Sequence, residues 1–204
     1  MSRTNLSMSM SADGYVAGPA QSLDEPLGIG GRDLHDWHLG PAADHPVNKQ
    51  VVADMMAGMG ATIMGRNMFG PIRGEWADSQ WKGWWGDEPP YHCPVFVLTH
   101  YARDSIEMAG GTTFHFVTTG IESAHEQARA VAGDRPISIA GGASCGRQAI
   151  QAGLVNEIDL QISPVLLGAG ERLLDGFAPG SPTLALVRVL EAPGVAHLRY
   201  RVVN

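Results

Sequence analysis

Short apolar runs that end at turn-forming residues recur along the chain and predict strands. Residues 5–10 alternate polar and apolar side chains, as a strand with one buried face does, and they run into the turn signal at 11–14. Five more strands are predicted from later apolar runs, over residues 61–64, 94–98, 113–117, 137–140 and 157–162. Two final runs, 184–190 and 197–203, flank Ala192-Pro193-Gly194 and predict a hairpin.

Helices are predicted where the apolar spacing changes to three or four residues. A helix is predicted from about residue 45 to 57, because an apolar stripe recurs every fourth position at Val47, Val51, Met55 and Met59, and Gly58 and Gly60 end it. A second helix is predicted over 121–132, with Glu122 early and Arg129 late to complement the helix dipole. A third follows Gly141-Gly142 and runs to about Ala152.

Strands that alternate with helices predict an α/β fold, with a central mixed, mostly parallel sheet, flanking helices and a C-terminal antiparallel hairpin. The 204 residues suffice for one domain, which we place over residues 1–204. Residues 18–46, rich in Gly, Pro and Asp, and residues 70–93, with four Trp, are predicted to be long loops.

Composition excludes several kinds of partner. The net charge is −7, from 14 Lys and Arg against 21 Asp and Glu, so the chain is a poor general binder of nucleic acid. No apolar run approaches the roughly 20 residues of a membrane span, and the first residues lack the apolar core of a secretory signal. We therefore expect a cytoplasmic protein, with Cys93 and Cys145 as free thiols.

The sharpest candidate for ligand binding is the segment 137–146. There an apolar strand meets Gly141-Gly142 and then a helix that starts near Ser144. Glycines allow close approach to a phosphate, and a helix N-terminus offers free N–H groups with a partial positive charge. The alternative is a tight turn that needs glycine only for its backbone angles. The segment does not match GxGxxG, so an ordinary dinucleotide fingerprint is not indicated.

Two further strand ends carry groups that can bind an anion. Arg66 follows the strand 61–64, at the carboxyl end where α/β sheets bind ligands, and its guanidinium suits a phosphate. Alternatively, it pairs with a surface carboxylate. Thr99 and His100 follow the strand 94–98, with Arg103 three residues on. Any one such strand end is commonplace, whereas three in one chain, each with groups that can bind an anion, are less so.

These segments, in this order, resemble the family that joins dihydrofolate reductase to the reductase domain of riboflavin biosynthesis. The resemblance spans roughly residues 5–203 and is carried by residues 11–17, 64–69, 94–99, 139–143, 153–158 and 164–168. The last two blocks resemble the riboflavin branch more than true dihydrofolate reductases. The resemblance implies an NADPH-dependent reductase in which the protein positions the nicotinamide against the substrate.

The resemblance also assigns roles along the cofactor. Arg66 matches the arginine at the adenosine 2′-phosphate, the 141–144 turn matches the pyrophosphate site, and the end of the first strand matches the nicotinamide site. The residues expected to bind NADPH are Ser9, Ala12, Val16, Ala17, Gly65, Arg66, Asn67, Met68, Thr99, His100, Arg103, Gly141, Gly142, Ala143 and Ser144. Met68 departs from the family, in which many members have Thr.

Three residues are candidates for the catalytic group. True dihydrofolate reductases carry a carboxylate on the first helix, and Asn48 occupies roughly that place here. An amide cannot relay a proton, so we do not expect efficient dihydrofolate reduction. Asn48 alternatively hydrogen-bonds backbone, and Asp54 is then the fallback acid. Asp13 either touches the substrate or shapes its turn with Gly14.

The remaining candidates have ordinary alternatives. The loop histidines His35, His38 and His45 lack the Cys or carboxylate frame of a metal site, so we expect no metal. The tryptophans of the second loop either line the substrate cleft or pack the loop or a dimer contact; they are Trp76, Trp81, Trp84 and Trp85. Cys145 is interpreted as a small helix-start residue.

We therefore predict an NADPH-dependent reductase of a small pteridine- or pyrimidine-like substrate. One alternative is a nucleotide- or flavin-binding protein of the same fold without turnover. Another is a stand-alone riboflavin-pathway reductase, although no second basic cluster for a ribityl phosphate is evident and the deaminase zinc motif is absent. A homodimer is expected because the family usually dimerises and the hairpin offers an apolar edge.

Overall fold

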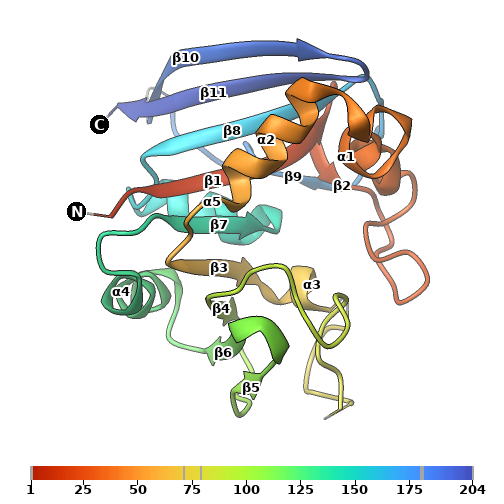
Figure 1. Ribbon diagram of the computed structural model, residues 1–204. Coiled ribbons are helices and arrows are strands. Elements are labelled where there is room, and N and C mark those ends of the chain that lie inside the picture. Colours follow the sequence, from red (N-terminus) through yellow and green to blue (C-terminus); the bar gives the residue numbers. More distant parts are fainter. Residues whose placement is uncertain (1, 71, 79, 180–181, 204) are drawn as a thin grey trace.

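A nine-stranded sheet forms the centre of the computed structural model, which describes residues 2–70, 72–78, 80–179 and 182–203 (Figure 1). In spatial order its strands are β10 (Thr183–Ala192), β11 (Val195–Val203), β8 (Glu157–Ser163), β1 (Thr4–Ser11), β7 (Ile137–Gly141), β3 (Ala61–Gly65), β4 (Pro94–Leu98), β6 (Thr113–Val117) and β5 (Ile106–Glu107). The strands from β8 to β6 are parallel, whereas β11, β10 and β5 run antiparallel to their neighbours. The carboxyl ends of the parallel strands therefore meet at one edge.

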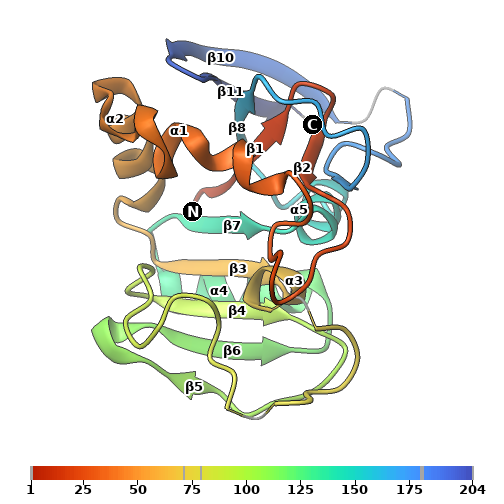
Figure 2. The same ribbon diagram turned by 90° about the vertical axis from the view of Figure 1, so that its right-hand side faces the viewer.

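Helices cover both faces of this sheet. On one face α4 (Ile121–Ala132) packs against β3 and β4, and α5 (Ala143–Gln151) packs against β7. On the other face α2 (Pro46–Met56) contacts β10, and α1 (Asp36–Leu39) packs beside it (Figure 2). A small second sheet pairs β2 (Tyr15–Ala17) with β9 (Glu171–Arg172).

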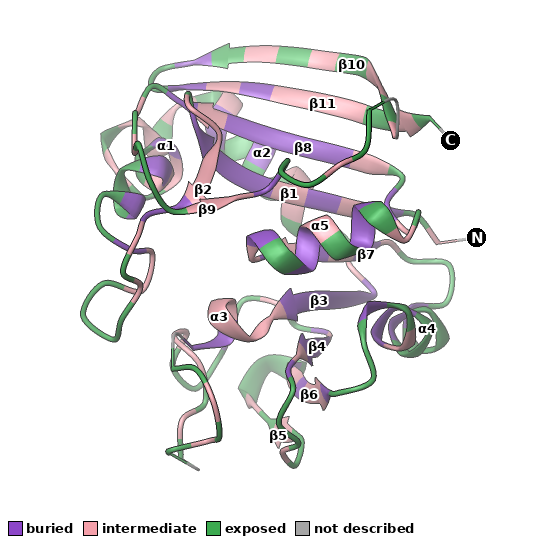
Figure 3. Cartoon of the chain, turned by 180° about the vertical axis from the view of Figure 1, so that it is seen from behind, coloured by how far each residue is buried: buried purple, intermediate pink, exposed green. Residues whose placement is uncertain are grey.

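The main apolar core lies between the sheet and the pair α4 and α5 (Figure 3). Leu6, Ile63 and Ile137 are fully buried there. An added Cβ at Gly146 of α5 would lie 2.7 Å from Leu6 Cδ1, so the helix backbone lies directly on β1. The alternation along β1 thus places its apolar residues on the α5 side.

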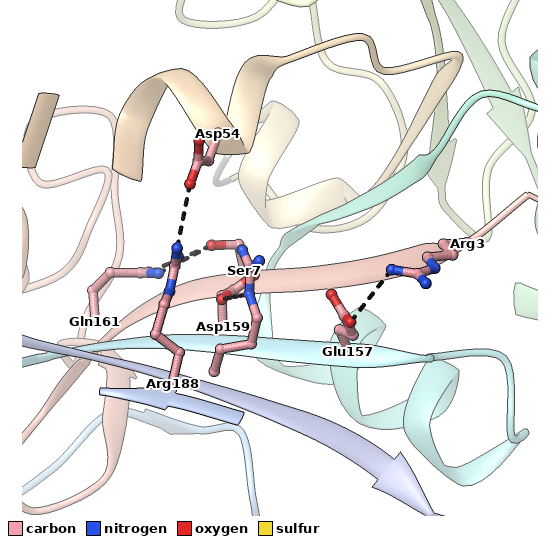
Figure 4. Close-up of polar contacts among 8 residues, drawn as sticks. Arg3, Ser7, Asp54, Glu157, Asp159, Gln161 and Arg188 are labelled. Atoms are coloured by element: carbon pink, nitrogen blue, oxygen red, sulfur yellow. Dashed lines mark hydrogen bonds and ion pairs between the residues drawn. The ribbon is translucent and has the colours of Figure 1, made fainter. Parts of the chain in front are cut away.

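The opposite face of β1 and β8 is polar. Ser7 of β1 accepts a hydrogen bond from Gln161 Nε2 at 3.2 Å (Figure 4). Arg199 donates two hydrogen bonds of 2.7 and 3.0 Å to Asp159. The buried Asp159 and Gln161 side chains thus both have hydrogen-bond partners.

The predicted fold class is confirmed. All the predicted strands and helices are present, and Val47, Val51 and Met55 form the apolar contacts of α2, whereas Met59 lies after the helix end. The prediction of a plain loop over 18–46 was wrong. This segment contains α1 and two 3-10 helices, η1 (Gly31–His35) and η2 (Pro41–Asp44), and it buries Leu34 and Trp37. No helix among the described residues is long and apolar enough to cross a membrane.

Candidate active site at the carboxyl edge

The carboxyl ends of four parallel strands bring the predicted cofactor residues together. Gly65 ends β3 and Arg66 follows it, Thr99 and His100 follow β4, and the Gly141-Gly142 turn starts at the last residue of β7, which lies beside β3. Ser9, Ala12, Val16 and Ala17 lie along β1, its turn and β2. Segments far apart in the sequence thus line one edge of the sheet, at the ends of the arrows in Figure 2.

Two arginines approach one tryptophan at the ends of β3 and β4. The guanidinium carbon of Arg66 lies 3.4 Å from the centre of the Trp76 ring, and that of Arg103 lies 4.8 Å from it. Arg66 Nη1 donates to the carbonyl of Gly74 at 2.7 Å and to Thr99 Oγ1 at 3.4 Å. Arg103 donates to the carbonyl of Trp81 at 2.7 Å. Backbone and aromatic contacts therefore fix both guanidiniums.

The charge of Arg66 is not balanced by an acid in the described part of the chain. No carboxylate there forms an ion pair with Arg66. Burial and then the nearby charge of Arg103 lower the pKa of Arg66, so the positive charge is electrostatically unfavourable where it lies. A phosphate bound here would relieve that cost, because it supplies negative charge and acceptor oxygens for a planar guanidinium.

The tryptophan loop packs against the outer face of β3, β4 and β6. Trp76 contacts Phe69 and Phe116 edge to face, and Trp81 Nε1 donates to the carbonyl of Phe69 at 2.9 Å. A hollow beside Arg66 is also lined by Trp76 and Trp81. These contacts show loop packing, and a substrate cleft lined by the tryptophans stays a prediction. Residues 71 and 79 of this loop lie outside the described part.

The glycine turn between β7 and α5 leaves the N-terminus of that helix without a side-chain cap. Gly141 has φ +145°, a backbone conformation that side chains disfavour, and the Gly141–Gly142 peptide bond is cis. Gly142 caps α5 without a side-chain hydrogen bond, so the first N–H groups of α5 are not covered by a cap. Met68 lies against this turn, because its Sδ would be 3.0 Å from a Cβ at Gly141. Burial raises the pKa of the Cys145 thiol to about 12, which agrees with a packing role.

The three candidate catalytic residues are all engaged elsewhere in the protein. Asn48 is fully buried, where its Nδ2 donates to the carbonyls of Trp37 at 3.0 Å and Ala42 at 2.9 Å, and its Oδ1 accepts from His197 Nε2 at 2.8 Å. Both amide protons and the carbonyl oxygen are therefore engaged within the protein, which favours the structural interpretation.

The two carboxylates are likewise occupied. Asp54 accepts a hydrogen bond from Gln50 at 2.7 Å and lies 3.6 Å from Arg188 Nη1 (Figure 4). Asp13 accepts hydrogen bonds from the backbone N–H groups of Leu167 and Gly168. A hydrogen bond from Ser11 and those backbone bonds lower the pKa of Asp13 to about 2. Asp13 is therefore ionised at neutral pH and is no proton donor there.

Some contacts at this edge were missed from the sequence. Trp76 packs on the guanidinium of Arg66, and the sequence indicated this contact only by the place of Trp76 in a tryptophan-rich loop after the strand that leads to Arg66.

The rings of His35 and His38 are hydrogen-bonded to each other at 3.1 Å, and burial lowers the pKa of His35 to about 4. Within the described ranges no group of three or more His, Cys, Asp or Glu is arranged to hold a metal ion.

Fold and site together define an α/β protein of the dihydrofolate-reductase-like class. The sequence matches the model of the RibD C-terminal domain over residues 4–198. The chain belongs to this family, which is the reductase domain of RibD, an oxidoreductase. No curated protein matches the sequence.

Several solved structures share the fold. A putative riboflavin biosynthesis protein from Shewanella sp. PV-4 is 19% identical, with a TM-score of 0.68 and 99% of each chain covered. A pyrimidine reductase-like protein from Corynebacterium diphtheriae is 14% identical, with a TM-score of 0.60, and the match covers 100% of this chain and 92% of that one. RibD from Acinetobacter baumannii is 18% identical, with a TM-score of 0.64; the match covers 100% of this chain and 59% of RibD.

Proposed function

We propose that the chain is an NADPH-dependent reductase of a small pyrimidine- or pteridine-like heterocycle. The proposal is carried by the two arginines, Arg66 and Arg103, that lie against Trp76. In the described chain Arg66 has no acidic partner. The strand β3, which precedes Arg66, neighbours β7, and β7 leads to the uncapped start of α5. These two features would hold the 2′-phosphate and the diphosphate of one dinucleotide. Membership in a reductase family and the pyrimidine reductase-like relative support the substrate class.

The cofactor would supply the hydride, and the residues of this chain would bind and orient the two reacting rings. Arg66, with Thr99 beside it, would select the 2′-phosphate. Ser9, near the end of β1, would lie by the nicotinamide, and its hydroxyl is fixed by a 2.9 Å hydrogen bond from Trp37 Nε1. No proton donor is assigned, because Asn48, Asp13 and Asp54 all have other partners.

A second candidate function is a dinucleotide-binding protein without turnover, and the contacts of the candidate catalytic residues favour it. All three candidate catalytic side chains are engaged in contacts within the protein, so binding groups are present where a proton relay is not. Binding of NADPH without oxidation across a panel of pyrimidines and pteridines would favour this second candidate.

The experiment is a calorimetric titration of the purified chain with NADPH and with NADH. We expect at least a roughly tenfold preference for NADPH, since a charge-assisted hydrogen bond contributes ~1.5–3 kcal/mol. Arg66→Ala should abolish the preference, whereas Arg129→Ala on the exposed side of α4 should leave it unchanged. Equal affinities for the two cofactors in the wild type would overturn the assignment of Arg66, and absence of binding to both would overturn the function.

We also propose that the chain forms a homodimer through the C-terminal hairpin. Helices α4 and α5 leave β10 and β11 uncovered (Figure 3). Leu186, Val187 and Val189 of β10 are 59%, 51% and 55% exposed, which is unusual for three neighbouring aliphatic side chains on an edge strand. A second copy of the same hairpin would cover them by a two-fold contact.

A further inference from the structure

An ion pair crosses the carboxyl edge of the sheet. Arg73 Nη2, on the loop that follows Arg66, lies 3.9 Å from Glu171 Oε1 on β9. Both side chains are largely in solvent, at 68% and 42% exposure. They border a hollow of about 360 Å³, whose other walls are residues 18–21 and Gly170. The pair therefore joins the loop after α3 (Arg66–Phe69) to β9 across this hollow.

The Glu171 side of the hollow is a tightly packed backbone frame. Glu171 pairs with Ala17 in the small sheet. Gly170 has φ +129°, and a Cβ there would lie 2.0 Å from the carbonyl oxygen of Ala17. Gly18 is equally constrained, because its Cβ would lie 2.1 Å from the carbonyl oxygen of Ile29. This packing therefore holds the backbone of Glu171 in place, so that the Arg73 and Glu171 side chains are the parts that can move across the hollow.

The Arg73 side is tied to the proposed 2′-phosphate site. Arg66 donates to the carbonyl of Gly74, the residue next to Arg73. On the opposite side, the carbonyl of Arg172, next to Glu171, accepts a hydrogen bond from Arg147 of α5 at 2.8 Å. The ion pair thus links the loop held by Arg66 to β9, whose Arg172 carbonyl is bound by α5. The glycine turn before α5 lies close to the end of β3, because a Cβ at Gly65 would lie 3.4 Å from the backbone nitrogen of Gly142. Figure 2 shows the segment between β2 and η1 descending past the ends of β7 and β3 on this edge.

We propose that Arg73 binds the diphosphate of the dinucleotide and that Glu171 holds this arginine while the cofactor is absent. The proposal rests on the proposed function, because it adds a residue to that same site. An exposed Arg–Glu pair contributes little to stability, so exchanging the carboxylate costs little. A diphosphate offers more negative charge and paired acceptor oxygens to the guanidinium. Glu171 then competes with the ligand and weakens cofactor binding.

The test compares Arg73→Ala and Glu171→Gln by calorimetry with three probes: NADPH, NADH and adenosine 2′-monophosphate. The two dinucleotides carry the diphosphate, and the monophosphate carries only the 2′-phosphate. We expect Arg73→Ala to weaken NADPH and NADH by the same factor, roughly five-fold, and to leave the monophosphate unchanged. Glu171→Gln should tighten both dinucleotides by roughly two- to five-fold, and this gain should vanish in the double variant.

A matched control is Arg3→Ala. Arg3 is 73% exposed, much like Arg73, and it pairs at 3.7 Å with Glu157, which is 18% exposed, at the amino end of β1 (Figure 4). Its loss should not change any affinity. Dinucleotide binding that is the same in Arg73→Ala and in the wild type overturns the role of Arg73 and leaves the proposed function standing. A wild type that binds neither dinucleotide overturns the proposed function, and this inference with it.

Discussion

Replacing Asn48 by Asp would separate the structural from the catalytic interpretation of this residue. The change preserves the shape of the side chain but turns the amide nitrogen into an oxygen. In the wild type that nitrogen donates both of its protons, to the carbonyls of Trp37 and Ala42. In the variant, three oxygens would face one another in a buried place. We therefore expect a loss of stability and no gain of dihydrofolate turnover.

The size of the loss follows from these contacts. Each hydrogen bond lost contributes about 1 kcal/mol, and a buried acceptor left without a donor costs about 1–3 kcal/mol. A stronger hydrogen bond from His197 to the new carboxylate offsets part of this loss. The expected decrease in the free energy of unfolding at neutral pH is about 3 kcal/mol, which is large for one isosteric change.

The loss should also depend on pH. In the wild type, burial and then the charge of Arg188 lower the pKa of His197, so its protonation on acidification destabilises the fold. In Asn48→Asp the adjacent carboxylate raises the pKa of His197 in the folded state. Stability from a raised pKa is present at low pH and is lost as the pH rises through that pKa. The difference between variant and wild type should therefore be smaller at pH 5.5 than at pH 8.

The assay is urea unfolding followed by tryptophan fluorescence at both pH values, together with a steady-state assay of dihydrofolate and NADPH. Gln127→Glu is the matched control, because it makes the same change on the exposed face of α4 and should stay within about 0.5 kcal/mol. An Asn48→Asp protein as stable as the wild type that also turns over dihydrofolate would refute the reasoning, since Asn48 would then face the substrate.

Three further predictions test other parts of the structure. Light scattering should give twice the 21.7 kDa chain mass for the wild type, and the same mass for the control Val131→Glu on the exposed side of α4. Val189→Glu on the hairpin should give the mass of one chain, and a wild type of one-chain mass would contradict the dimer. Gly170→Ala should cost about 3 kcal/mol or more in thermal unfolding, against about 1 kcal/mol for Gly176→Ala, which has open space around it; equal costs would disprove the tight frame. Stability should fall as the pH drops from 6.5 towards 4, because burial lowers the pKa of His35 to about 4, and His35→Gln should remove about 2 kcal/mol of that fall; an unchanged pH profile would exclude this histidine.

Local sequence patterns predict the sheet and its helices because burial repeats with the periods of strands and helices. The alternation in β1 and the four-residue stripe of α2 translate directly into buried faces. The short helices between residues 31 and 44 were missed, because each is too short to establish a period. Trp37 is buried there against Val51 of the following helix α2 and against β11, which lies far away in the sequence.

The site is less predictable than the fold. Arg66 and the 141–144 turn were identified from strand ends, where the chemistry is local. Asn48 and His197 are about 150 positions apart, and Arg73 and Glu171 are about 100 positions apart. No pattern of neighbouring residues can predict contacts over such distances in the sequence. A helix wheel shows that Asn48 faces inwards, but only the folded chain shows that carbonyls and a histidine meet it there.

The place of β1 between β8 and β7 has a consequence for synthesis of the protein. Residue 4 pairs with residue 137 and residue 5 with residue 157, so neither partner exists when β1 leaves the ribosome. At about 5–20 residues per second, translation takes roughly ten to thirty seconds to reach β8. During that time Leu6 and Met8 have no sheet to join, and the nascent chain presents an apolar strand to chaperones. The speed of translation, and not the strength of the finished sheet, sets the length of that exposure.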